Sequence, residues 1–183
     1  MTALKDQLLG ALVGLSRASE SKEISESAGE ALVEGLRLVH SLETTAELYS
    51  PYTDTTTGSS KPASENPVFS SGLTDQNEIR IMIDRLHEEK NKMAPDCAAC
   101  QYPCGRTFDY EMEEVYSASE SMREAKLLLF HLLGQIAACS FVSGKQETRQ
   151  FLSDALFQIS CTYTAEQLAE PLKKAEDILQ NNR

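Results

Sequence analysis

The sequence predicts an all-α fold, a bundle of five to six helices with a cysteine-rich loop and a long flexible linker. Apolar residues recur at three- and four-residue steps over most of the chain, as in amphipathic helices. No stretch shows the apolar and polar alternation of a strand, and no internal repeat is visible. Because 183 residues can bury a core without cross-links, we expect one domain overall.

Two helices are predicted at the start of the chain. Residues 3–18 place a row of leucines and alanines on one face. Residues 22–48 repeat this pattern after a Ser-Glu-Ser break that offers an N-cap. Gly29 and Gly35 in the second helix weaken it modestly, or they let another helix approach closely.

The segment after these helices has almost nothing to bury. Residues 50–73 are rich in Ser, Thr and Pro, so burial cannot offset the entropy of ordering their backbone. We therefore expect a flexible linker between an N-terminal helical pair, residues 1–49, and a helical core over residues 74–183. The core carries the cysteine loop, residues 95–107.

Two further helices frame the cysteine loop. A capping box at Asp75 predicts the start of a helix over residues 75–93, and Pro95 ends it. Acidic residues then predict the first turns of a long helix over residues 109–141, which Gly144 stops. Its expected core positions are Val115, Met122, Ala125, Leu128, Leu129, Leu132, Ile136 and Cys139.

The remaining chain predicts a helix over residues 146–160 and a last helix after a second capping box at Thr164. Pro171 lies near the start of the last helix and should kink it or delay its start. Cys139 and Cys161 lie on apolar helical faces, where a free cysteine acts as a small buried hydrophobe.

Charge and hydropathy exclude several functions. The net charge of −11 and the pI of about 4.7 disfavour nucleic acid and anionic membranes as partners. The most apolar run, residues 127–142, is too short and too polar to span a membrane. The first residues do not have the continuous apolar core of a signal peptide, so we expect a reducing cytoplasm. There, clustered cysteines indicate metal or redox chemistry more often than structural disulfides.

Three of the five cysteines, Cys97, Cys100 and Cys104, fall within eight residues at CxxCxxxC spacing. Two residues between cysteines let the backbone turn and direct both thiolates toward one ion, and the third cysteine can complete a face. Gly105 permits a close backbone approach, and Arg106 can offset the negative charge of three thiolates. The spacing therefore predicts a metal site.

A fourth ligand is harder to find. Cys139 is 35 residues past Cys104, and a continuous helix at roughly 1.5 Å per residue puts it on the order of 45 Å away. The same reasoning excludes Cys161 and His131, unless the helix breaks near residues 117–121. The remaining protein candidates are Asp96, His87 and His40. We expect three cysteines and a non-cysteine, exogenous or second-chain ligand.

The run Asp-Cys-x-x-Cys-x-x-x-Cys-Gly-Arg-Thr, over residues 96–107, resembles the iron–sulfur cysteine run of hybrid-cluster proteins, the hydroxylamine reductases, and their carbon-monoxide-dehydrogenase relatives. The resemblance covers about a dozen residues. It implies an iron–sulfur or related metal site with Cys97, Cys100 and Cys104 as ligands.

Three functions follow from these residues. The first is a cytoplasmic iron–sulfur protein for electron transfer, redox sensing or small-molecule redox chemistry, with a protein redox partner. The second is a non-enzymatic interaction module whose loop is held by structural zinc. The third is a thiol–disulfide redox protein that uses Cys97 and Cys100. A homo-oligomer could supply the missing ligand from a second chain.

Overall fold

The computed structural model describes residues 2–49, 71–95, 120–162 and 164–182, and in these ranges it contains helices and no strand. The helices are α1 (Thr2–Ala18), α2 (Glu26–Tyr49), α3 (Ser71–Met93), α6 (Glu120–Ala138), α7 (Ser140–Ser143), α8 (Gln146–Cys161), the 3-10 helix η3 (Ala165–Leu168) and α9 (Ala169–Gln180). The all-α prediction is confirmed. The linker predicted over residues 50–73 lies outside the described residues up to residue 70, and α3 already includes the rest.

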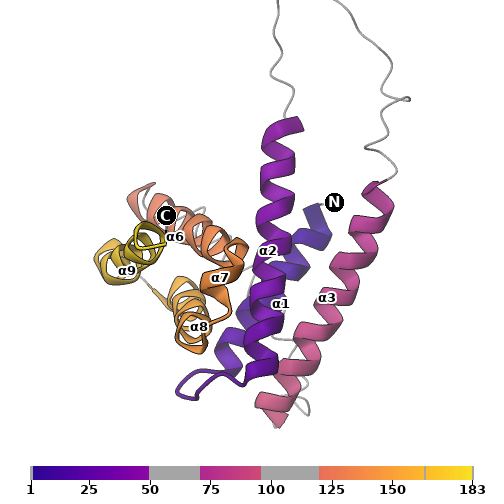
Figure 1. Ribbon diagram of the computed structural model, residues 1–183, viewed down its shortest axis with the longest axis horizontal. Coiled ribbons are helices and arrows are strands. Elements are labelled where there is room, and N and C mark those ends of the chain that lie inside the picture. The colour runs from indigo at the N-terminus through magenta and orange to yellow at the C-terminus, as the bar shows by residue number, and fades with distance from the viewer. Residues whose placement is uncertain (1, 50–70, 96–119, 163, 183) are drawn as a thin grey trace, which may run out of the picture.

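Helix α2 lies at the centre of the bundle. Figure 1 shows α1, α2 and α3 on one side and α6 to α9 on the other, and α2 contacts α1, α3, α6 and α8. Helix α9 packs on α6 at the outside. These helices share one apolar core, whose largest fully buried side chains include Leu12, Leu32, Leu36, Leu86, Leu129, Leu133 and Leu152. No helix in the described ranges is long and apolar enough to cross a lipid bilayer.

The turn between α1 and α2 is held by α8. The side-chain oxygen of Gln150 accepts a hydrogen bond from the Ile24 N–H at 2.7 Å, and the Gln146 amide donates to the Ile24 carbonyl at 2.6 Å. Ser25 Oγ then accepts from the Ala28 N–H at 3.3 Å, which caps α2. Helix α2 therefore begins four residues later than the predicted start at residue 22, and the earlier serines are not its cap.

Two glycines of α2 lie at close helix contacts. A Cβ atom at Gly35 would lie 2.7 Å from Leu12 Cδ2 and 3.3 Å from Leu86 Cδ1, and one at Gly29 would lie 3.1 Å from Arg149 Cβ. These distances leave no room for a methyl group unless a neighbour moves. Close approach, one of the two roles expected for these glycines, is what the structure shows.

The long helix predicted to reach residue 141 ends earlier. Cys139 has extended backbone angles, φ −81° and ψ 96°, which separate α6 from the short α7. Arg37 on α2 stabilises this break, because its Nε donates to the Ala137 carbonyl and its Nη2 donates to Ser143 Oγ at 2.7 Å. The prediction of a continuous helix to residue 141 was wrong, because α7 is a separate short helix.

The buried face of α6 also differs from the prediction at one position. Leu129, Leu133 and Ile136 are fully buried and Met122 is nearly so, at positions that follow a helical repeat. Leu128 is 48% exposed, so its assignment to the core was wrong. Val115, another predicted core residue, lies outside the described residues.

The capping boxes and prolines that predicted other helix boundaries can be compared with the structure. Helix α3 begins at Ser71, four residues before Asp75, so Asp75 is not its N-cap, whereas Pro95 does follow its end. The Thr164 capping box is present on η3, where the Thr164 N–H donates to Gln167 Oε1 at 3.3 Å. Because Pro171 is the third residue of α9, the α-helical start is delayed to Ala169, as expected.

Candidate functional site

The predicted metal site falls in a part of the chain that the structure does not describe. All six of its residues, Cys97, Cys100, Cys104, Asp96, Gly105 and Arg106, lie between residues 96 and 119, outside the described ranges. The site therefore stays a prediction from the sequence. What the structure does describe is the helix that leads into the segment, α3, and the helix that follows it, α6.

The end of α3 that leads into the cysteine segment is tied to the rest of the fold. Lys22, in the turn between α1 and α2, donates from Nζ to the Met93 carbonyl at 3.2 Å. The Ala94 N–H donates to the Lys90 carbonyl at 2.9 Å and continues the helical hydrogen bonding beyond Met93. The chain thus enters the segment from a helix end that contacts the N-terminal turn.

A buried carboxylate strengthens this junction. Glu89 on α3 is 6% exposed, and it accepts hydrogen bonds from Lys92 Nζ at 2.7 Å and from Ser27 Oγ at 2.9 Å. The hydrogen bond from Lys92 is the largest cause that holds the pKa of Glu89 below its ordinary value, and Ser27 acts in the same direction against the effect of burial. Because Ser27 lies on α2, the carboxylate joins α2 to α3.

Replacing this carboxylate tests the junction. Because the folded-state pKa of Glu89 lies below its ordinary value, the ionised form stabilises the fold at pH 7, and this contribution is lost as the pH falls through the folded-state pKa. We expect Glu89→Gln to lower the free energy of unfolding at pH 7 by about 1 kcal/mol, since Lys92 is exposed and solvent weakens its pairing. Urea unfolding at pH 7 and pH 3 measures this.

The control for this experiment is Glu88→Gln, which makes the same substitution at the adjacent, exposed position. The difference in free energy of unfolding between Glu89→Gln and the unchanged chain should be smaller at pH 3 than at pH 7. Glu88→Gln should leave the free energy of unfolding unchanged at both pH values. An equal loss in both variants would contradict the role assigned to Glu89.

The other two cysteines lie in the described ranges, 22 positions apart in the chain. Cys139 is partly buried at the break between α6 and α7 and packs against the core. Cys161, the last residue of α8, is exposed, so its predicted burial was wrong. It lies nine positions after the buried Leu152, and nine steps of about 100° bring it to the opposite face of the helix.

The structure brings two of the three histidines together. The rings of His40 on α2 and His131 on α6 have centroids 5.9 Å apart and are tilted by 57°. Both side chains are half-buried. His87 lies on α3, and partial burial of its ring, followed by Lys90, holds its pKa below the ordinary value against the opposing effect of Asp84.

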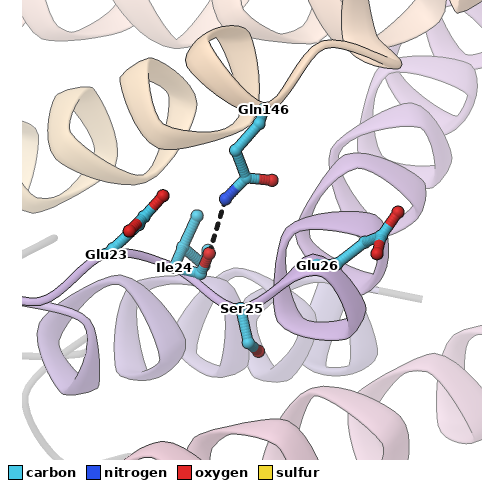
Figure 2. Close-up of a pocket in the computed structure, with 5 residues that line it drawn as sticks. All are labelled: Glu23, Ile24, Ser25, Glu26 and Gln146. Carbon is cyan, nitrogen blue, oxygen red and sulfur yellow. Dashed lines mark hydrogen bonds between the residues drawn. The ribbon is translucent and has the colours of Figure 1, made fainter.

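A shallow hollow lies where the turn between α1 and α2 meets α8. It is lined by Glu23, Ile24, Ser25, Glu26 and Gln146. Figure 2 shows the two carboxylates on opposite sides of the hollow, and the Gln146 amide directed to the Ile24 carbonyl. Since the carboxylates do not converge, the hollow is better explained as the junction that holds the turn than as a ligand site.

In the described ranges, no group of three or more His, Cys, Asp or Glu side chains is placed to hold a metal ion. Comparison with known proteins adds no assignment: no family model, no curated protein and no solved structure matches the chain.

The histidine contact was missed by sequence reasoning. His40 and His131 are 91 positions apart in the chain. No signal in the sequence indicates that α2 and α6 pack at these positions. The nearest clue is Gly134 in an otherwise bulky helix, which marks a place where a neighbour can approach.

Proposed function

We propose that this chain is a small cytoplasmic protein that binds an iron–sulfur cluster through Cys97, Cys100 and Cys104. Its role would be electron transfer, redox sensing or small-molecule redox chemistry, with a protein redox partner. The observation that carries the proposal is the CxxCxxxC spacing, which can bring three thiolates to one centre. The likeness of residues 96–107 to the cysteine run of hybrid-cluster proteins favours iron and sulfide over zinc.

The size of the hydrophobic core supports a functional role for the proposed metal centre, because the fold does not need a metal for its stability. Its buried side chains come from α1, α2, α3, α6, α7, α8, η3 and α9, all within the described ranges. Small domains need a structural metal when they cannot build enough core of their own. This bundle has such a core, so a metal held near residues 97–104 is free to serve redox chemistry.

A zinc-stapled interaction module is the second candidate, because one observation favours it. Three large apolar side chains on α6 and α7 are exposed: Leu127 by 53%, Leu128 by 48% and Phe141 by 77%. Exposed apolar groups on neighbouring helices are typical of surfaces that contact another protein. In this function zinc would hold the loop, and the helices would dock a partner or a second copy of the chain.

Chemical reduction separates the two candidates. We expect protein purified without oxygen to absorb visible light, to lose that absorbance on addition of dithionite, and to recover it on reoxidation. The variant with Cys139→Ser and Cys161→Ser should behave identically, because neither residue belongs to the proposed site. A colourless protein with bound zinc would instead support the interaction module.

A further inference from the structure

We propose that His40 and His131 form a second metal site, which binds one divalent ion of intermediate hardness such as Zn²⁺ or Ni²⁺ between α2 and α6. Each histidine supplies one ring nitrogen, and water completes the coordination. The two side chains come from different helices, and both are half-buried, so solvent reaches the pair. The pair contains no residue of the cysteine segment, and the proposal does not depend on the function of that segment.

The ring geometry is close to that of a chelate. A metal-bound imidazole nitrogen lies ~2.0–2.1 Å from zinc, so two rings on one tetrahedral ion have centroids on the order of 5 Å apart. The His40 and His131 centroids are 5.9 Å apart, and their 57° tilt is an angle at which two ligands can approach one ion. The ring separation is therefore within about 1 Å of that expected for two imidazoles on one ion.

Two neighbours on α6 position the rings. A Cβ atom at Gly134 would lie 3.1 Å from His40 Cβ and 3.2 Å from His40 Nδ1, so the missing side chain is what lets His40 lie against α6. Because Nδ1 is buried there, Nε2 is the nitrogen of His40 that would bind an ion.

Gln135 orients the second ring. Its amide lies 2.9 Å from His131 Nε2, one helical turn away. A 180° rotation of the terminal amide of Gln135 exchanges the positions of its oxygen and nitrogen. With the oxygen toward the ring, Gln135 accepts from Nε2–H and leaves the Nδ1 lone pair of His131 for a metal, the arrangement in which ligating histidines are commonly held.

The test uses Ni²⁺ alone, on full-length protein in which Cys97, Cys100 and Cys104 are replaced by serine so that thiolates do not compete. The chain has three histidines, and single His→Gln variants assign their ring proton signals in NMR spectra. We expect Ni²⁺ below one equivalent to broaden the His40 and His131 signals together and to leave His87 sharp. His40→Gln should raise the Ni²⁺ concentration that broadens His131 by at least about tenfold.

His87→Gln is the matched control, and it should leave the broadening of the pair unchanged. Circular dichroism checks that each variant remains folded. The proposal is overturned if all three signals broaden at the same Ni²⁺ concentration, or if His131 broadens equally with and without His40. Either result would mean that the histidines bind ions singly.

Discussion

Cys100→Ser is expected to abolish binding of the proposed cluster and to leave the helical content nearly unchanged. Cys100 is the middle cysteine of the run, and both proposed neighbours in the site are within four residues of it. Loss of one of three thiolates leaves two protein sulfurs, too few to hold an iron–sulfur cluster, which takes cysteine thiolates as its main ligands. Iron and sulfide content should fall to background.

The helical content should persist because the hydrophobic core is built from residues outside the cysteine segment. Far-ultraviolet circular dichroism of Cys100→Ser and of the unchanged protein measures this. Cys161→Ser is the matched control, since it makes the same atomic change at an exposed position. Complete loss of the helical signal in Cys100→Ser would contradict this account and would assign the site a structural role.

Leu129→Ala is expected to lower the free energy of unfolding by about 3 kcal/mol. Leu129 is fully buried on α6, where its helix meets the core. Truncation removes its apolar contacts and leaves a cavity that the neighbouring helices fill only in part. Urea unfolding followed by circular dichroism gives the difference in free energy.

The adjacent Leu128→Ala is the control, because it removes the same atoms from a side chain that is 48% exposed. We expect it to change the free energy of unfolding by less than about 1 kcal/mol. Since sequence periodicity placed both leucines in the core, the pair tests the structure directly. Equal losses in the two variants would mean that α6 is rotated relative to the orientation described.

The fold class follows from the spacing of apolar residues, and so do most helices. Burial of Leu12, Leu32 and Leu152 agrees with the three- and four-residue steps that predicted their helices. Prolines also predicted helix boundaries, because the missing N–H and the fixed φ of proline act on the local backbone. Pro95 and Pro171 lie at helix boundaries for that reason.

Features that depend on tertiary contact were not predictable. The break at Cys139 has no glycine or proline, and it is stabilised by Arg37, about 100 residues earlier in the chain. The late start of α2 depends on Gln146 and Gln150, which hold Ile24 from another helix. The contact between His40 and His131 is of the same kind. The cysteine site lies outside the described residues, so its prediction still comes from the spacing of the cysteines and from the resemblance of residues 96–107.

The most direct test of the proposed function is the iron, zinc and acid-labile sulfide content of the protein purified without oxygen, together with its visible spectrum. We predict brown protein with iron and sulfide in comparable amounts. Both should be lost when Cys97, Cys100 and Cys104 are replaced by serine. Colourless protein with about one zinc per chain would contradict the redox function and support the interaction module. Protein without any metal would contradict both and leave Cys97 and Cys100 as a thiol pair.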